Sequence, residues 1–302
     1  MEEKKFISII IPAYNEEEAI GWVIDRIHEV FGPLDYDYEI LVIDDGSTDK
    51  TSDVVSAKEA TLIKRKFNKG CGAARKIGIL EAKGDIIAML DADKSYDPKD
   101  LPNLIEQIDE WDMINGVRQQ EKGSLRFLRV PAKFVIRKLA EYLSGHKIPD
   151  LNTGMKVFKK SILLRYLWVI PDGFSCVTSM TLSFLCNGYS VGFIPIEYYK
   201  RLGKSKFQPI QDTARYIQTV LRIIIYFNPG KIFTPLSIGL FLIGVVKTLY
   251  DYFFVVHRMQ TSDVVIILSS FIFFIIGTIA DLIVSQSKQH LYTVVEHNSK
   301  KR

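Results

Sequence analysis

The sequence carries two pairs of carboxylates whose spacing could do chemistry, Asp44 with Asp45 and Asp91 with Asp93. Asp91 and Asp93 flank one residue directly after an apolar run, so both carboxylates can turn toward the same cleft. Such oxygen ligands suit a hard divalent cation, which keeps waters or phosphate oxygens in its remaining positions. A cation held there would neutralise a diphosphate and act as a Lewis acid for its departure. Asp44 and Asp45 suit ribose hydroxyls or the edge of a base.

Two further polar segments follow apolar runs in the same way. They are Pro12–Glu16 and the glycine-rich Asn68–Arg75, in which Gly70 permits close approach of the backbone to a ligand. The glycine-rich segment lacks the GxGxxG of dinucleotide-binding proteins and the GK[ST] of a P-loop, which argues against both classes. Each segment alone is a weak signal, but four together predict one shared ligand site.

An alternation of apolar runs and helix-periodic stretches must position these residues. Helices are expected after Asn15, after Asp49, after Gly70 and from Pro98 to about Glu110, with Asn15 as the N-cap of the first. The alternation predicts an α/β fold with a mainly parallel sheet covered on both faces. In such sheets ligands bind beyond the carboxyl ends of the strands. The expected strands are Ile7–Ile11, Tyr38–Ile43, Thr61–Lys66, Asp85–Leu90 and Met113–Gly116.

Composition bounds the class of protein. The chain has 302 residues, of which 47% are apolar and 25% charged, and a net charge of +4. These values exclude a disordered, a collagen-like or a disulfide-stapled chain. The three cysteines form no CxxC pair, which argues against a disulfide framework and a zinc site and favours a reducing, cytoplasmic setting.

Charge is distributed unevenly along the chain. Residues 1–60 hold 15 acidic and 5 basic side chains, residues 118–160 hold 3 and 11, and residues 198–231 hold 1 and 7. This order predicts that the first part meets cations and the later parts meet anions. Nucleic acid is one candidate anion, but the rest of the chain favours a phosphorylated lipid surface. A solvated helix face beside anionic lipid is the simpler alternative for the basic block.

The C-terminal part contains two long apolar segments, Ile232–Val256 and Val264–Val284, joined by the polar link His257–Asp263. Each exceeds the roughly 20 residues that a membrane-spanning helix needs. Basic residues precede the first segment and end the chain, so the positive-inside rule places both termini in the cytoplasm. Two buried core helices of a soluble domain are the alternative. Lys247 and Asp281 are interpreted as snorkelling residues near the interface, with a functional role left open.

The stretch before this hairpin, residues 207–227, has an amphipathic and basic pattern. It predicts a helix lying on the membrane face, with a plain core helix as the alternative.

Taken in order, the motifs PAYNEE, DDGSTD, NKGCGAARKIGI and DAD resemble those of the inverting family 2 glycosyltransferases with the GT-A fold, over roughly residues 5–231. Within that family the chain is most similar to the polyprenyl-phosphate (dolichyl-phosphate) glycosyltransferases, which join a cytoplasmic catalytic domain to transmembrane helices. The resemblance extends to Gly116–Arg118, Asp150–Gly154 and Arg201–Lys206. It implies a catalytic domain at 1–206, an interface helix at 207–231, a transmembrane hairpin at 232–286 and a basic cytoplasmic tail at 287–302.

The same resemblance implies roles for individual residues. Asp91 and Asp93 would bind Mg²⁺ or Mn²⁺, with Asp93 also counted as catalytic. The acceptor phosphate would be held by Arg118, Arg129 and Arg201. The nucleotide would contact Pro12, Tyr14, Glu16, Asp44, Asp45 and Gly70.

Two departures from the family pattern affect the site. Ser95 stands where relatives often have Gln, so Ser95 is the candidate third metal ligand and this position stays open. Lys133 stands four residues after Arg129, where relatives have Ser. The chain contains no Gln-x-x-Arg-Trp motif, which argues against a processive polysaccharide synthase.

The resulting hypothesis is metal-dependent, inverting transfer of one sugar from a UDP- or GDP-sugar to a polyprenyl phosphate at the cytoplasmic membrane face. The expected partners are the nucleotide-sugar, the lipid phosphate and the membrane, without nucleic acid; homo-oligomerisation stays open. One alternative is transfer to a lipid hydroxyl such as that of diacylglycerol, with Asp150 or Asp172 as the base. Another is a catalytically silent membrane scaffold.

Overall fold

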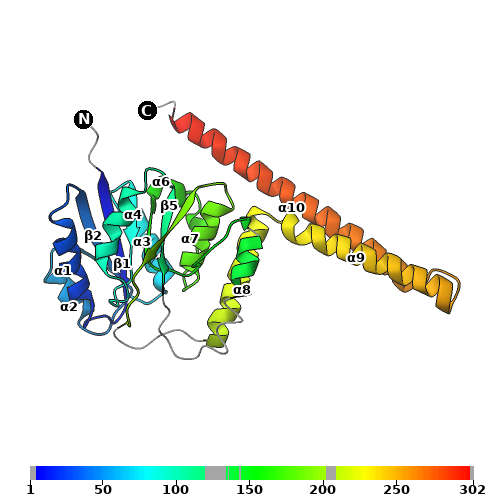
Figure 1. The fold of residues 1–302 in the computed structure, drawn as a ribbon, viewed down its shortest axis with the longest axis horizontal. Coiled ribbons are helices and arrows are strands. Elements are labelled where there is room, and N and C mark those ends of the chain that lie inside the picture. Colours follow the sequence, from blue (N-terminus) through cyan, green and yellow to red (C-terminus); the bar gives the residue numbers. More distant parts are fainter. Residues whose placement is uncertain (1–4, 120–133, 135, 143, 202–208, 300–302) are drawn as a thin grey trace. The chain divides into compact units, whose positions relative to one another are not determined.

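A computed structural model describes residues 5–119, 134, 136–142, 144–201 and 209–299, with the backbone alone for 209–215 and 287–299. The chain divides into two compact units, Met1–Val220 and Leu221–Arg302. Figure 1 shows the strands and shorter helices of the first unit and the two long helices of the second.

A seven-stranded sheet forms the centre of the first unit, in the order β3-β2-β1-β4-β6-β5-β7. β1 pairs in parallel with β2 and β4, β2 with β3, and β5 with β7, whereas β6 runs antiparallel to both of its neighbours. The predicted α/β class and mainly parallel sheet are therefore confirmed. The strands are β1 (Phe6–Ala13), β2 (Asp37–Asp44), β3 (Thr61–Lys64), β4 (Ile86–Met89), β5 (Met113–Arg118), β6 (Lys156–Lys159) and β7 (Val191–Ile196).

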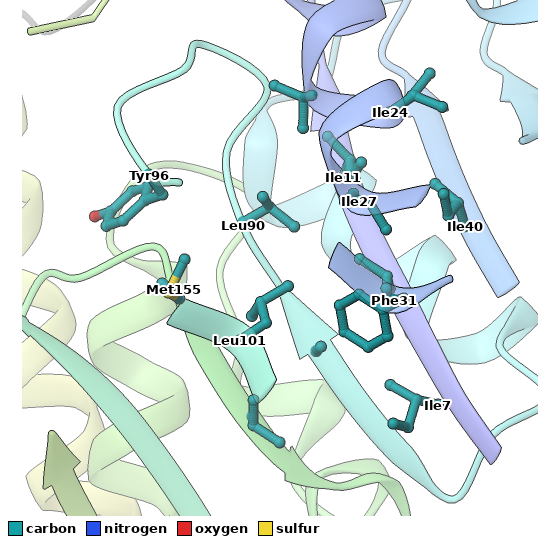
Figure 2. Close-up of a cluster of buried hydrophobic side chains, with 14 of the residues drawn as sticks. Ile7, Ile11, Ile24, Ile27, Phe31, Ile40, Leu90, Tyr96, Leu101 and Met155 are labelled. Atoms are coloured by element: carbon teal, nitrogen blue, oxygen red, sulfur yellow. The ribbon is translucent and has the colours of Figure 1, made fainter. Parts of the chain in front are cut away.

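Helices cover both faces of this sheet because successive residues of its central strands point to opposite sides. On one face, Ile7 and Ile11 of β1 pack with the buried stripe of α1 (Ile20–Phe31), as Figure 2 shows. On the other face, α3 (Cys71–Glu81) lies so close that a Cβ on Gly78 would stand 2.5 Å from the side chain of Ile10. The other elements are α2 (Thr51–Ser56), η1 (Pro98–Asp100), α4 (Leu101–Glu106), α6 (Lys160–Leu164), η2 (Leu167–Val169), α7 (Cys176–Leu185) and α8 (Pro209–Phe227).

The start of the first helix differs from the prediction. α1 begins at Ile20 without a side-chain cap, so the predicted N-cap role of Asn15 is wrong. Asn15 has a φ of 52°, a left-handed conformation that Asn tolerates better than most residues, and its Oδ1 accepts a hydrogen bond from the Thr48 N–H (2.8 Å). The residue ties two loops together instead of capping a helix.

The second unit is a helical hairpin made of α9 (Gly230–Tyr250), the π-helical turn η3 (Asp251–Val255) and α10 (Thr261–Ser299). Segments 230–255 and 261–286 are predominantly apolar and long enough to span a membrane. Most of their surface is exposed, with Ile243 59% and Ile283 58% accessible, which argues against two buried core helices.

Lys247 does not snorkel alone at the turn of the hairpin. Its Nζ lies 2.6 Å from Asp251 Oδ2 and 2.6 Å from Asp263 Oδ1. Asp263 is fully buried, and such a charge is stable only when it is paired. The ion-pair cluster therefore joins the end of α9 to the start of α10.

Candidate active site

Loops from the carboxyl ends of β1 and β2 are joined by hydrogen bonds at one edge of the sheet. The N–H groups of Asn15 and Glu16 donate to the hydroxyls of Ser47 and Thr51, at 2.9 and 2.8 Å. The Asp45 N–H also donates to the carbonyl of Ala13 at 2.9 Å. The first two predicted site segments thus form a single rim.

Asp44 and Asp45 are buried within this rim, at 0% and 2% exposure. Asp44 accepts hydrogen bonds from the Ser47 N–H (2.8 Å) and the Ser52 hydroxyl. Asp45 accepts one from the Gly70 N–H (2.7 Å) and pairs with Arg65 (2.8 Å). Both carboxylates are engaged in holding the loops of the rim.

Gly70 makes the close backbone approach that its motif predicts, but the neighbouring group belongs to this chain. With a φ of +102°, a Cβ on Gly70 would lie 2.5 Å from the carbonyl oxygen of Asp172. The same carbonyl accepts a hydrogen bond from the Gly72 N–H at 2.7 Å, in the first turn of α3. This helix N-terminus is therefore closed by the loop that precedes α7.

Asp91 and Asp93 follow β4, and their charges are only partly compensated. Asp91 Oδ1 accepts a hydrogen bond from Arg75 Nη2 at 2.5 Å. Burial raises the pKa of Asp91, the charge of Arg75 opposes this effect, and the nearby Asp93 carboxylate adds to it. Asp93 Oδ1 accepts hydrogen bonds from the Ser95 N–H (3.0 Å) and the Ser95 hydroxyl. The predicted third ligand, Ser95, is thus placed to orient Asp93.

Arg118, at the end of β5, forms a two-pronged ion pair with Asp150. Its Nε and Nη2 lie 2.6 and 2.8 Å from the two carboxylate oxygens. Burial alone would raise the pKa of Asp150, but the hydrogen bonds and charge of Arg118 outweigh it and lower that pKa. The guanidinium also lies 5.2 Å from the centre of the Tyr198 ring, so it has a cation–π contact in addition to its ion pair.

Arg201 lies beside Asp93, one of the two predicted metal ligands. Its Nη2 lies 3.4 Å from Asp93 Oδ2, and its Nε is buried without a hydrogen-bond partner among the described residues. The Tyr199 N–H holds this segment in place by donating to the Ser95 carbonyl at 3.0 Å. The guanidinium of Arg201, from the basic stretch 198–231, therefore lies next to the acidic residues of the site.

Arg129, the third predicted phosphate ligand, and Lys133 lie outside the described residues. Of the residues predicted for the nucleotide, Pro12 is the β1 residue paired with Ile43 of β2. Tyr14 and Glu16 are half-buried in the loop that follows.

Comparison with known proteins decides the family of this chain. The sequence model of glycosyl transferase family 2 matches residues 8–167, which is more than half of the chain. The chain belongs to glycosyl transferase family 2. It is an enzyme of the glycosyltransferase class, and a second model, the GtrB C-terminal hairpin, matches residues 228–285. The hairpin and its apolar helices indicate a membrane-associated family member.

Two relatives of the family 2 chain are named for lipid phosphates. A dodecaprenyl-phosphate galacturonate synthase of Rhizobium johnstonii is 26% identical over 300 residues, which cover 92% of this chain and 87% of the relative. A dolichyl-phosphate hexose transferase of Haloferax volcanii is 26% identical over 220 residues, 72% of this chain and 93% of the relative.

The fold is shared with an enzyme of known structure. Glucosyl-3-phosphoglycerate synthase from Mycobacterium tuberculosis, in complex with Mn²⁺, uridine diphosphate and glucosyl-3-phosphoglycerate, superposes with a TM-score of 0.58. The alignment covers 73% of this chain and 80% of that one at 20% identity. At this identity the likeness shows the fold alone.

The residues present fit a divalent cation that shares its coordination with a ligand. Among the described residues, no group of three or more His, Cys, Asp or Glu side chains could hold a metal ion alone. Asp91 and Asp93 lie close enough for their charges to repel each other. The absence of a side chain at Gly154 leaves room for the Asp91 carboxylate, because a Cβ there would collide with it. A cation there would complete its shell with diphosphate oxygens and water.

Sequence motifs alone missed several residues that build this site. Arg75 lies inside a predicted motif, but nothing local to it indicates its contact with Asp91. Tyr96, almost fully buried, accepts a hydrogen bond from the Gly154 N–H (2.8 Å) and packs edge-on against Tyr198. The closeness of these two tyrosines in sequence to Asp93 and Arg201 was the signal that could have found them.

Proposed function

We propose that this enzyme transfers one sugar from a UDP- or GDP-sugar to a polyprenyl phosphate, with inversion, at the cytoplasmic face of a membrane. The observation that carries the proposal is the contact of Arg201 with Asp93 at 3.4 Å. This contact places a guanidinium, which can bind an anion, beside the carboxylates that would hold a metal ion and, through it, a diphosphate. A site with both features can hold an anionic acceptor beside an anionic leaving group.

Asp91 and Asp93 would hold Mg²⁺ or Mn²⁺ on the donor side. When bound, such an ion neutralises the charge that develops on the departing nucleoside diphosphate. The Ser95 hydroxyl keeps Asp93 oriented, and Arg75 fixes Asp91 at 2.5 Å. The buried Asp44 and Asp45 support the rim on which the nucleotide would lie.

The acceptor phosphate needs no general base. A phosphate monoester has a second pKa of about 6, so it is already largely anionic at neutral pH. Its oxygen forms a bond to the anomeric carbon while the bond to the diphosphate breaks on the opposite face, which inverts the configuration. Arg201 offers this phosphate its Nε, which has no hydrogen-bond partner among the described residues, while Arg118 and Arg129 are its proposed companions.

The rival acceptor, a lipid hydroxyl, would need a carboxylate base. Asp150 is tied to Arg118 by two hydrogen bonds, and its lowered pKa makes it a weak base. Asp172 pairs with Lys76 at 2.5 Å. These contacts favour the phosphate acceptor, as do the names of the two relatives.

The hairpin would anchor the enzyme beside its lipid acceptor, with α8 on the membrane face and both termini in the cytoplasm. The link 257–263 between the two helices contains one Lys or Arg residue, Arg258, whereas residues 300–302 are all Lys or Arg. This distribution of positive charge supports a cytoplasmic location of the termini. Cysteines introduced at Gln260 and Ser299 should be labelled from opposite sides of the membrane. Labelling of both from one side would contradict this topology.

A donor screen tests the proposed function. The purified full chain in detergent, with a short polyprenyl phosphate, should convert at least one UDP- or GDP-sugar to a glycosylated lipid phosphate detected by mass spectrometry. The anomeric configuration of the product, read by NMR, should be opposite to that of the donor. Transfer to diacylglycerol alone would replace the proposal with its rival.

A further inference from the structure

Two of the three cysteines meet beside the candidate active site. Cys71 is the first residue of α3 and Cys176 is the first residue of α7. The Cys71 and Cys176 thiols lie close enough for each to shift the pKa of the other. Cys176 is fully buried, whereas Cys71 is partly exposed, so Cys71 is the more accessible residue of the pair.

The glycine-rich start of α3 brings these helix ends together. A Cβ on Gly72 would stand 2.8 Å from the Cβ of Cys176. The Gly72 and Ala73 N–H groups donate to the Asp172 carbonyl at 2.7 and 3.2 Å, which fixes the first turn of α3 against the loop before α7. These backbone contacts hold the first turn of α3, which begins at Cys71, against the start of α7 at Cys176.

Arg75 connects this pair to the candidate metal site. Its Nη1 donates to Cys176 Sγ at 3.1 Å, and its Nη2 donates to Asp91 Oδ1 at 2.5 Å. The side chain is only 4% exposed, and its Nε has no partner among the described residues. The Arg75 guanidinium thus donates hydrogen bonds to both the Cys176 sulfur and the Asp91 carboxylate. A change in the charge of one acceptor therefore alters the strength of the bond to the other.

The surroundings favour a thiolate in the pair. Both cysteines lie at helix N-termini, where the helix dipole stabilises negative charge. The hydrogen bond from Cys71 and the charge of Arg75 lower the pKa of Cys176 to about 6, although burial opposes them.

We propose that Cys71 and Cys176 are a redox-sensitive pair that hydrogen peroxide oxidises to a reversible disulfide, which weakens the enzyme. The contact with Cys176 and burial raise the pKa of the Cys71 thiol, so its thiolate forms by passing the proton to the Cys176 thiolate. The partly exposed Cys71 thiolate then attacks an oxygen of hydrogen peroxide. This step gives a sulfenic acid on Cys71 and a hydroxide, which takes the proton of Cys176 and leaves as water.

The second step closes the disulfide. The Cys176 thiolate attacks the Cys71 sulfenic sulfur and displaces a hydroxide, which the solvent protonates to a second water. The two sulfurs lose two electrons and the peroxide gains them.

The disulfide removes the anionic partner of Arg75 Nη1. The guanidinium then directs its charge to Asp91, which competes with a cation for that carboxylate. A change in the groups that contact a metal ligand typically alters metal affinity or activity about 10- to 100-fold, so the stronger Arg75–Asp91 contact should weaken cation binding. The effect on transfer rests on the proposed function, whereas formation of the disulfide does not.

The experiment uses the full chain in detergent, treated with hydrogen peroxide and then alkylated. Mass spectrometry should find a Cys71–Cys176 linked peptide and a chain lighter by two hydrogens, and dithiothreitol should reverse both. Transfer should fall at least about tenfold and recover on reduction. The matched control is Cys186→Ser, since Cys186 lies at the other end of α7, roughly 15 Å away, and this variant should respond like the parent.

The variants Cys71→Ser and Cys176→Ser should form no cross-link and keep their own untreated activity after peroxide. Free alkylation of both thiols in the treated parent would overturn the proposal, and so would equal inactivation of Cys71→Ser. A cross-link that leaves transfer unchanged would overturn the proposed weakening of the enzyme. If the reduced protein transfers no sugar but still forms the cross-link, the proposed function fails while the redox pair stands.

Discussion

The two acidic turns of the site resemble each other in sequence but are satisfied by different partners. Asp44 and Asp45 are buried and engaged by N–H groups, hydroxyls and Arg65 of the same rim. Asp91 and Asp93 face arginines from two distant segments of the chain, Arg75 of α3 and Arg201 beyond β7. The contacts of the first turn therefore hold the loops of the rim together, whereas we propose that the second turn presents charge for chemistry.

This difference separates stability from catalysis. Removing a charge from the first turn leaves a buried donor or cation without its partner, which costs folding free energy. Removing the charge of Asp93 relieves its repulsion with Asp91 and would remove a proposed metal ligand. Asp→Asn should therefore lower stability at Asp45 and lower transfer at Asp93.

The largest effect is expected for Asp93→Asn. The amide keeps the shape of the side chain and can still accept from Ser95, but it loses the charge that a cation needs. Transfer should fall on the order of a thousandfold while the melting temperature stays close to that of the parent. EDTA should have the same effect until Mg²⁺ or Mn²⁺ is restored.

Asp109→Asn is the matched control, because the Asp109 side chain is 69% exposed and pairs with Lys5 at the surface. It should transfer like the parent. Full activity of Asp93→Asn, or of the parent in chelator, would contradict the claim that Asp93 holds a metal ion needed for transfer.

The next effect concerns the arginine that faces the second turn. Arg201→Ala should lower kcat/KM for the lipid phosphate about 10- to 100-fold, because a charge-assisted hydrogen bond contributes about 1.5–3 kcal/mol. Arg201→Lys should recover part of this loss, since a point charge replaces the fork. Steady-state kinetics at varied lipid concentration measure this change in kcat/KM, with Arg26→Ala as the surface control. Unchanged lipid kinetics would show that Arg201 serves only to balance Asp93.

A stability effect is expected for Asp45→Asn in the first turn. The change breaks the ion pair with the largely buried Arg65 and should lower the free energy of unfolding by about 2 kcal/mol. For a unit of this size the melting temperature should fall by about 4–8 °C. Thermal unfolding in detergent, run beside Asp93→Asn, measures the difference. A stable Asp45→Asn variant with a raised KM for the nucleotide-sugar would instead support direct nucleotide contact.

An effect confined to the pH dependence of stability is expected for Lys156, whose amine is held by neutral groups. It is fully buried on β6, and its Nζ donates to Asn115 Oδ1 (2.7 Å) and Thr181 Oγ1 (2.8 Å). Burial lowers the pKa of Lys156 to about 7. Between pH 7 and its ordinary pKa the unfolded chain binds a proton that the folded chain does not. Its contribution to stability therefore rises with pH, by about 1 kcal/mol per pH unit.

The variant Lys156→Met should lose this rise between pH 7 and 9. Melting temperatures at several pH values, compared with Lys159→Met on the same strand, isolate the effect because Lys159 is paired with Asp112 at 3.0 Å. Parallel pH dependence in the parent and in Lys156→Met would refute the burial argument.

Local sequence patterns were sufficient for the framework of the catalytic unit. Apolar runs predicted five of its strands, since a strand buried on both faces is almost entirely apolar, as in Ile7–Ile11, where Ser8 is the one polar residue. They did not predict β6, because Lys156 and Lys159 begin and end it and the strand is only four residues long. β7 was missed as well, since Pro195 lies within it.

The sequence was less informative about which side chains meet. Arg118 and Asp150 are 32 residues apart, and the partnership of Arg75 with Asp91 and Cys176 joins three separate segments. Such contacts depend on how helices pack on the sheet, which periodicity does not specify. Glycine motifs were ambiguous for the same reason, because Gly70 permits close approach either to a ligand or to the Asp172 carbonyl.

The central claim, that an anionic lipid phosphate is the nucleophile, is tested most directly by a competition between two acceptors. The parent enzyme receives a saturating nucleotide-sugar with equal amounts of a polyprenyl phosphate and the polyprenol of the same length, and both products are quantified together. The account predicts sugar on the phosphate and none above background on the alcohol. Preferential glycosylation of the polyprenol would contradict it, because that reaction needs a general base, whereas Arg118 holds the Asp150 carboxylate in its ionised, weakly basic form.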